Sequence, residues 1–278
     1  MDIKRFAQNT YLYLVLSSLL FSILLSFVHI PYFSLISYAV MYIPPIIMLF
    51  IRRYPIKASL SLKRVSISQL LVAAVLAICG TIVVIILNNI INYPPSANNS
   101  LVTSLANYSL WPNMLIWIAG AILIELVYRG IIQNGFQHLA PLKLIFIISL
   151  LYAFPGSVFR APATIIIGAI YSLLVFKTGS VIPAVGAHII VSFLKQPLSH
   201  LIYNVSLMWG KIPTLVIFLL AAIGIAILLL VKMPGAAFKG SKDAEKTKLS
   251  PGFIVALVIA ALYTIWNSWG TLYFMSLY

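Results

Sequence analysis

Long apolar runs separated by short polar or basic segments make up most of the chain. A helix that spans a bilayer needs about 20 apolar residues. Runs of that kind predict nine helices, at residues 10–29, 33–51, 67–92, 113–134, 142–159, 162–177, 181–202, 213–231 and 252–275. Pro44-Pro45 predicts a kink in the second helix, because proline lacks an amide hydrogen and its ring clashes with the preceding turn. The short runs on either side of Arg160 also fit a broken or re-entrant pair that lines a cavity inside the protein.

The pattern therefore predicts an all-α fold, a polytopic transmembrane bundle of about eight or nine helices. The composition supports this class, since 62% of the 278 residues are hydrophobic and 8% are charged. Soluble domains carry about 25% charged residues. The bilayer is thus one expected partner, and little of the length is left for a soluble catalytic domain.

The basic residues predict how the chain is oriented. The net charge of +14 would suggest nucleic acid only if the basic residues formed a patch, but they fall in short runs between apolar segments. With the N-terminus inside, fourteen of the eighteen lie in inner loops: Lys4, Arg5, Arg52, Arg53, Lys57, Lys63, Arg64, Lys143, Lys177, Lys232, Lys239, Lys242, Lys246 and Lys248. Outer loops hold only Arg160 and Lys211. We expect a multi-pass protein of the cell membrane with a cytoplasmic N-terminus and no nucleic-acid partner.

Ionisable side chains inside the apolar runs identify the candidate site. Glu125 is the only acidic residue between Ile3 and Lys242, and Arg129 follows it one helical turn later. A charge at the centre of a bilayer helix costs about 2.5–3.5 kcal/mol, so an interaction must compensate it. The pair either holds helices together or belongs to a ligand or catalytic cavity. His188 is likewise either a polar tie to a neighbouring helix or an active-site group.

Several kinds of intramembrane protease chemistry are excluded. A zinc site of the His-Glu-x-x-His type needs two histidines one turn apart, and no such pair exists. An aspartyl protease needs two membrane aspartates, and no aspartate lies between Ile3 and Lys242. His188 and Ser192 are four residues apart but lack the glycine-rich context of a serine nucleophile, so packing explains them better. We predict neither a metal site nor a cofactor.

Three short segments that contain polar or small residues follow one another along the middle of the chain. The first is Ile124-Glu125-Leu-Val-Tyr-Arg129-Gly130-Ile-Ile-Gln133, and the second is Ser149-Leu-Leu-Tyr152-Ala-Phe-Pro-Gly156. The third runs from Lys177-Thr-Gly-Ser180 to His188-Ile-Ile-Val-Ser192. Together they resemble the motifs Glu-Glu-x-x-x-Arg, Phe-x-x-x-His and His-x-x-x-Asn/Asp of the CAAX-protease and bacteriocin-processing family of intramembrane endopeptidases. The resemblance covers roughly residues 113–195.

The resemblance implies a CAAX-protease-like core at residues 113–202, with N-terminal helices and an outer loop at 1–112 and C-terminal helices with a basic inner loop at 203–278. In the family, the first glutamate and the second-motif histidine activate a water, and the later polar pair holds the oxyanion or a metal. This chain has Ile124, Gly156 and Ser192 at three of those positions. Glu125 could in principle stand in for the missing base, but adjacent helical positions point about 100° apart, so its side chain would aim in another direction.

The resemblance leaves two functional hypotheses. In the first, the chain is a catalytically eroded member of the lysostaphin-resistance type, a scaffold or regulator of a single-pass or envelope membrane protein such as a cell-wall hydrolase. The small-residue stretches Ala119-Gly120-Ala121, Gly168-Ala169 and Gly186-Ala187 would let a partner helix approach closely. In the second, the chain is an active glutamate-type endopeptidase. A transporter fits less well, because a lone carboxylate without repeats gives little for coupling.

Under either hypothesis the same residues are candidates. The catalytic or remnant groups are Glu125, Arg129 and His188, and the binding groups are Tyr152, Gly156, Arg160 and Ser192. Arg160 is either an outer interfacial anchor or a cavity group, and Lys195 is expected to reach toward the outer interface. The five tryptophans, Trp111, Trp117, Trp209, Trp266 and Trp269, fit an interface belt.

Overall fold

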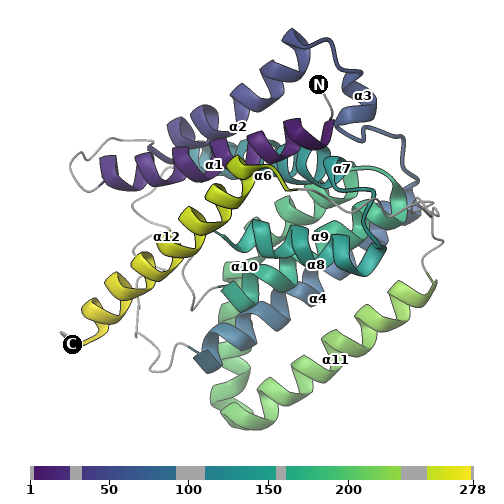
Figure 1. Ribbon diagram of the computed structural model, residues 1–278. Helices are drawn as coiled ribbons and strands as arrows, with labels where there is room; N and C mark the ends of the chain where they lie inside the picture. The colour runs from purple at the N-terminus through teal and green to yellow at the C-terminus, as the bar shows by residue number, and fades with distance from the viewer. Residues whose placement is uncertain (1–2, 26–32, 92–109, 155–160, 233–248, 277–278) are drawn as a thin grey trace.

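A computed structural model describes residues 3–25, 33–91, 110–154, 161–232 and 249–276. The helices are α1 (Ile3–Leu25), α2 (Phe33–Ile51), α3 (Ile56–Ser59), α4 (Ile67–Ile91), α6 (Leu110–Glu125), η1 (Leu126–Ile132), α7 (Gln133–Gly135), α8 (Pro141–Ala153), α9 (Ala161–Thr178), α10 (Ile182–Trp209), α11 (Lys211–Lys232) and α12 (Pro251–Ser276). None of the described ranges contains a strand. The predicted all-α bundle is confirmed (Figure 1).

The apolar runs predicted most helices to within a few residues, and the differences have physical causes. Helix α1 begins at Ile3 rather than at residue 10, because Ala7 and Tyr11 already face the core while Arg5 and Asn9 are exposed. This first part is amphipathic, so a search for uniformly apolar residues overlooks it. The short helix α3 was not predicted, since four residues are too few to show a period.

Helix α8 ends earlier than predicted. The run at 142–159 suggested a longer helix, but α8 stops at Ala153, and Phe154 is extended with φ −86° and ψ 130°. The next residue is Pro155, and a residue before proline is driven out of the α region by the ring. The predicted re-entrant arrangement around Arg160 falls on residues 155–160, outside the described residues. Helix α2 continues through Pro44 and Pro45.

Four helices in the described part of the chain are long and apolar enough to cross a membrane. They are Ile3–Leu24, Ile67–Asn88, Met114–Gly135 and Ala161–Thr178. Shorter apolar stretches occur at Leu35–Ile51, Pro141–Ala153, Ile212–Ile227 and Pro251–Trp266. The chain is therefore a multi-pass membrane protein. Beyond these four spans, the total of about eight or nine stays a prediction.

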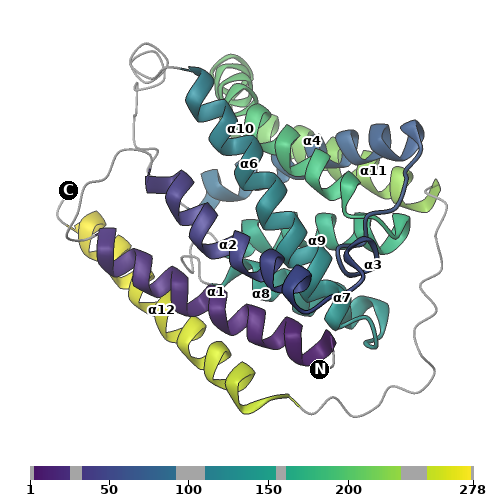
Figure 2. The same ribbon diagram turned by 90° about the horizontal axis from the view of Figure 1, so that it is seen from above.

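Buried apolar side chains form two clusters. The first apolar cluster joins α1, α2, η1, α8 and α12 and includes Tyr11, Leu14, Leu49, Tyr128, Ile131, Ile148, Leu151 and Phe253. The second apolar cluster joins α4, α9 and α10 and includes Leu76, Ala77, Ala163, Ile167, Tyr171, Leu174, Val175, Ala184 and Ala187. Helix α6 lies between α1, α2 and α12 on one side and α4, α10 and α11 on the other (Figure 2). The segment Leu110–Gly135 is therefore placed to connect the two clusters.

A strap at residues 52–66, which contains α3, lies across one end of the bundle. The Asn134 side chain donates to the carbonyls of Ala58 and Ser59 at 3.0 and 3.1 Å. At the other end of the strap, the Val181 amide donates to the carbonyl of Ser61 at 3.0 Å. The strap thus links the end of α7 to the turn between α9 and α10.

The same end of the bundle collects other helix ends. A Cβ at Gly135 would lie 3.2 Å from the carbonyl oxygen of Ile3, so α7 ends beside the start of α1. The Ser250 amide donates to Gln8 Oε1 at 3.1 Å, so α12 begins beside the start of α1 too. The strap, the starts of α1 and α12 and the turn before α10 therefore share one face, the one to which the charge pattern assigns the basic inner loops.

Candidate functional site

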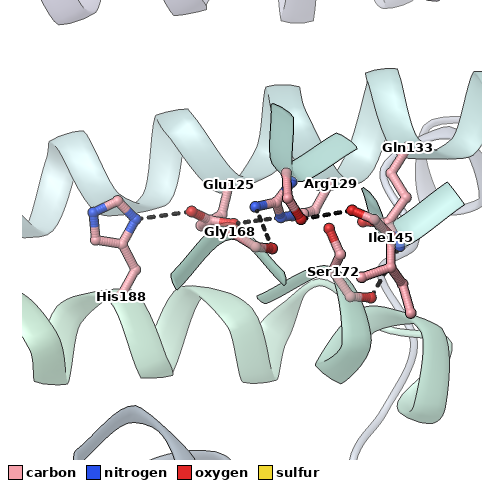
Figure 3. A network of polar contacts seen from close by, with 8 residues as sticks. Glu125, Arg129, Gln133, Ile145, Gly168, Ser172 and His188 are labelled. Atoms are coloured by element: carbon pink, nitrogen blue, oxygen red, sulfur yellow. Dashed lines mark hydrogen bonds and ion pairs between the residues drawn. The ribbon is translucent and has the colours of Figure 1, made fainter. Parts of the chain in front are cut away.

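The candidate site centres on Glu125, the last residue of α6. Its side chain is fully buried. One carboxylate oxygen, Oε1, lies 2.9 Å from Nδ1 of His188 on α10, and the other, Oε2, lies 3.3 Å from Nε of Arg129 (Figure 3). His188 is 16% exposed, whereas Arg129 is fully buried like Glu125. The carboxylate is therefore held between an imidazole and a guanidinium.

A stretch of π-helix begins immediately after Glu125. Residues Leu126–Ile132 form η1, a π-helix, in which backbone hydrogen bonds connect residues that are five positions apart rather than four. Such segments occur often at functional sites, because they turn side chains away from their ordinary α-helical directions. Here η1 carries Arg129, and it allows that side chain to contact both Glu125 behind it and α9 beside it. The hydrophobic pattern gave no indication of this change of helix type.

Arg129 joins α6 and η1 to α9. Its Nη2 donates to the carbonyl oxygen of Gly168 at 2.9 Å, and its guanidinium lies over the Tyr152 ring, 4.9 Å from the ring centre. Gly168 is necessary for this approach. A Cβ there would lie 3.2 Å from Tyr152 Cδ1, 3.3 Å from Ser149 Cα and 3.5 Å from Arg129 Nη2.

A further member of the network is Gln133, one turn beyond Arg129. Its Nε2 donates to the carbonyl oxygen of Ser172 at 3.1 Å. Glu125, Arg129 and Gln133 are thus spaced by four along one face, and the last two meet carbonyls that are also four residues apart on α9. The sequence analysis placed Gln133 in the first motif segment but did not count it among the candidate site residues, unlike Glu125 and Arg129. The signal in the sequence that identifies Gln133 is the spacing by four of Glu125, Arg129 and Gln133 within an apolar run.

Aromatic rings enclose the charged pair. Tyr152 meets Tyr128 edge-on at 5.2 Å between ring centres and Tyr171 at 6.4 Å. Tyr171 stacks on the His188 ring at 5.3 Å with an interplanar angle of 22°. These rings keep bulk water from Glu125 and Arg129, and stacking fixes the plane of the imidazole. Tyr152, predicted as a binding residue, therefore contacts the charged pair directly.

Several buried polar atoms of the network have no hydrogen-bond partner among the described residues. They are Glu125 Oε2, Arg129 Nε and Nη1, Gln133 Oε1, Tyr171 Oη and Ser172 Oγ. The contact between Arg129 Nε and Glu125 Oε2 is close enough for an ion pair but lacks hydrogen-bond geometry. Unpaired buried polar atoms are uncommon in proteins and are usually bonded to internal water. The cluster is therefore polar enough to hold small polar molecules.

Two other positions of the family motifs have different surroundings. Ile124, at the position of the family's first glutamate, packs against the first apolar cluster. Ser192 donates to the carbonyl of His188 on its own helix at 2.9 Å, so its hydroxyl hydrogen is not directed to Glu125. Gly156 and Arg160 lie outside the described residues. The geometry thus brings together Glu125, Arg129, His188 and Tyr152.

A pocket of about 440 Å³ lies further along α6 and α10. It is lined by Trp117, Ser192, Lys195, Gln196 and Ser199. Trp117 also packs edge-on against Phe193, 5.8 Å between ring centres. Lys195 is exposed and lines this pocket.

The chemistry available to the network follows from these contacts. A carboxylate acts as a general base only if one of its oxygens can reach a water or a substrate proton. Oε1 of Glu125 faces His188, and Oε2 faces Arg129. Among the described residues, no group of three histidine, cysteine or acidic side chains is placed to bind a metal. His188 is the one member of the Glu125–Arg129–His188 group with solvent-exposed surface.

The fold and this network define a class of protein. It is a helical multi-pass membrane protein whose two apolar clusters are joined by a buried carboxylate, guanidinium and imidazole. Residues 106–194 match the family model described as Type II CAAX prenyl endopeptidase, Rce1-like. This segment, about a third of the chain, is therefore similar to CAAX prenyl endopeptidases, and the predicted resemblance to the CAAX-protease family is confirmed. No curated protein and no solved structure matches the chain.

Proposed function

We propose that this protein is a CAAX-protease-type membrane protein without peptidase activity, which acts as a scaffold or regulator of a membrane partner. The observation that carries the proposal is the position of Glu125, which is fully buried with one oxygen facing His188 and the other facing Arg129. A carboxylate held in this way stabilises the bundle, since removing either partner would leave an uncompensated charge.

The residues around Glu125 support the same reading. Hydrolysis needs a base that activates water and donors that stabilise the tetrahedral oxyanion. Ile124 occupies the position of the family's first glutamate and packs against apolar side chains. Gly156 occupies the position of the second-motif histidine, and a glycine has no side chain to donate or accept a proton. The chain thus keeps the supporting residues of the family motifs and lacks two of the reacting ones.

A partner's membrane helix is the ligand class that fits this proposal. Of the three small-residue stretches, two are filled from within the protein: Gly120 packs under Tyr38, and Gly168 packs under Tyr152. Gly186 on α10 is half-buried, and a Cβ there would meet no atom within 4 Å. Small residues with an open side allow two membrane helices to approach closely. The resemblance to the lysostaphin-resistance type suggests a membrane-anchored cell-wall hydrolase as the partner.

The test is co-purification of the full-length protein from native membranes in mild detergent. We expect the wild type to retain a single-pass membrane protein and Gly186→Leu to lose most of it. Gly224→Leu is the matched control, because Gly224 on α11 also has no atom within 4 Å of its Cβ position. A wild-type protein that always purifies alone would refute the scaffold role. Equal loss of the partner in both variants would refute the proposal that the partner helix binds at Gly186.

A second candidate function is supported by a separate observation. Glu125 Oε2 and Tyr171 Oη are buried without a hydrogen-bond partner among the described residues. The other oxygen of the same carboxylate contacts the His188 imidazole. A water bound there would lie beside groups able to accept its proton, as an active endopeptidase requires. This alternative predicts cleavage of prenylated or leader peptides by the purified wild type, abolished in Glu125→Ala and in His188→Ala. Absence of cleavage by the wild type would exclude it.

A further inference from the structure

The hydroxyl of Ser172 on α9 differs from other helical hydroxyls of the bundle. A serine or threonine inside a helix often donates to the carbonyl four residues earlier. This bond is made, at 2.6–2.9 Å, by Ser17, Thr81, Ser149, Thr178 and Ser192. The corresponding acceptor for Ser172 is the Gly168 carbonyl, which instead accepts from Arg129 Nη2 at 2.9 Å. The Ser172 hydroxyl is therefore fully buried without a hydrogen-bond partner among the described residues.

Two further buried atoms of the network share this situation and belong to the same contacts with α9. Arg129 Nη1 is the second amino nitrogen of the guanidinium whose Nη2 binds Gly168. Gln133 Oε1 is the oxygen of the amide whose Nε2 binds the Ser172 carbonyl. Figure 3 shows Arg129, Gln133 and Ser172 together, on the side of Arg129 away from His188. The three atoms thus form one group at the end of the network opposite His188.

The chemistry of these three atoms selects a small neutral ligand. The guanidinium donates only, the amide oxygen accepts only, and the Ser172 hydroxyl does both. An anion would face Gln133 Oε1, and a cation would face Arg129, whose charge is already balanced by Glu125 at 3.3 Å. Close packing excludes a large molecule, because a Cβ on Gly168 would lie 3.5 Å from Arg129 Nη2. Water both donates and accepts and makes about three hydrogen bonds inside proteins, so it matches the group.

We propose that an internal water molecule bridges Arg129 Nη1, Gln133 Oε1 and Ser172 Oγ and so links the end of η1 to α9. The water accepts from the guanidinium, donates to the amide oxygen and bonds the hydroxyl. This site is distinct from Glu125 Oε2 and Tyr171 Oη, the atoms that the peptidase alternative requires. The proposal is therefore independent of whether the protein is a scaffold or a peptidase.

A double-mutant cycle on the full-length protein, unfolded reversibly in mixed micelles, tests the bridge. Ser172→Ala removes the hydroxyl but keeps the carbonyl that Gln133 Nε2 binds, and Gln133→Met approximates the shape of the side chain. Because both lose bonds to one water, the unfolding constant of the double variant should change about five- to tenfold less than the product of the single effects. Ser149→Ala is the matched control, since Ser149 is also buried but its hydroxyl donates to Ile145. Its effect should combine with Gln133→Met without coupling.

A crystal structure of the wild type that resolves ordered water gives a second measurement, which needs no variant. We expect density within hydrogen-bond distance of Arg129 Nη1, Gln133 Oε1 and Ser172 Oγ. Side chains that bond one another directly, with no density between them, would refute the bridge. An anomalous peak at this position in crystals grown with bromide would assign the site to an anion instead. In the cycle, independent effects of Ser172→Ala and Gln133→Met, or equal coupling with Ser149→Ala, would also overturn the proposal.

Discussion

At the scale of single residues, Glu125 has an unusual position for a carboxylate. It is fully buried in the middle of an apolar segment, and the two groups that face it belong to different places in the chain. Arg129 is one turn away on the same stretch, while His188 comes from α10. The contact with Arg129, nearby in sequence, positions the carboxylate. The contact with His188, distant in sequence, holds α6 and α10 together.

Replacing Glu125 by glutamine should destabilise the protein strongly. Glutamine keeps the size of the side chain but leaves the buried Arg129 guanidinium without its counter-charge, a loss of about 3–5 kcal/mol. The melting temperature in detergent should fall by several degrees or more. Gln196→Ala, at an exposed position on the same bundle, should melt close to the wild type. The double variant Glu125→Gln/Arg129→Gln should recover part of the loss. An unchanged melting temperature for Glu125→Gln would show that the ion pair is not structural.

Gly168 should tolerate even a methyl group poorly. In Gly168→Ala, the new Cβ would lie 3.3 Å from the backbone Cα of Ser149 and 3.2 Å from the Tyr152 ring. The backbone cannot move aside cheaply, so we expect a loss of about 1–3 kcal/mol from overpacking between α8 and α9. Gly186→Ala is the matched control, because its Cβ position is empty within 4 Å. That control should be neutral or more stable by up to about 1 kcal/mol, since alanine favours a helix. Similar melting temperatures for the two variants would contradict the tight contact at Gly168.

The residues of the site were only partly predictable. The spacing of Glu125 and Arg129 by four indicated a contact on one helix face, and this follows from helix geometry alone. The partners on α9 were not predictable, because Arg129 and Gln133 bind backbone carbonyls at Gly168 and Ser172. Every residue carries a carbonyl, so a sequence does not mark which one accepts a side-chain hydrogen bond.

At the scale of helices, the predictable features are those that depend on local composition. The ranges of α2 and α4 agree with the apolar runs at 33–51 and 67–92 to within one residue. The π-helical turn at Leu126–Ile132 and the short helix α3 were missed. Both depend on tertiary contacts: η1 is fixed by the helices that pack around it, and α3 is held by Asn134. A hydrophobic period reveals neither.

The strap that contains α3 should detach when its anchor is removed. Asn134→Leu loses the two bonds to the carbonyls of Ala58 and Ser59, worth about 0.5–1.5 kcal/mol each. Local opening should then increase roughly tenfold, because about 1.4 kcal/mol corresponds to a factor of ten. Limited trypsin digestion should cut after Lys57, Lys63 and Arg64 correspondingly faster. Asn204→Ala, at an exposed position far along α10, serves as the control. Equal digestion rates in both variants would mean that Asn134 does not hold the strap.

At the scale of the whole molecule, the polar network lies where two apolar cores meet. Tyr128 and Ile131 of η1 belong to the first apolar cluster, whereas Tyr171 of α9 and Ala187 of α10 belong to the second. The bonds from Glu125, Arg129 and Gln133 therefore run from one core to the other. Between membrane helices, apolar contacts alone give little driving force for association, because lipid tails are equally apolar. Polar bonds at this boundary supply the specificity that apolar packing lacks.

The orientation of the bundle gives the largest-scale prediction. The strap contacts the start of α10, because the Val181 amide donates to Ser61. The basic residues of the strap predict that this face lies in the cytoplasm. Asn204 lies 22 residues beyond Ile182 on the same helix, about 33 Å at 1.5 Å per residue, and the hydrocarbon core is about 30 Å thick. Lys57 and Asn204 should therefore lie on opposite sides of the membrane.

Cysteine labelling checks this arrangement directly. The chain has one cysteine, Cys79, which is buried and should give little background. On intact cells, a membrane-impermeant maleimide should label Asn204→Cys but not Lys57→Cys. Permeabilised cells should label both, because both positions are exposed. Labelling of Lys57→Cys alone on intact cells would show that the orientation is the opposite of the predicted one. Labelling of both from the outside would contradict the helix geometry itself, since a continuous α10 of this length cannot place its two ends on one side of a bilayer that it crosses.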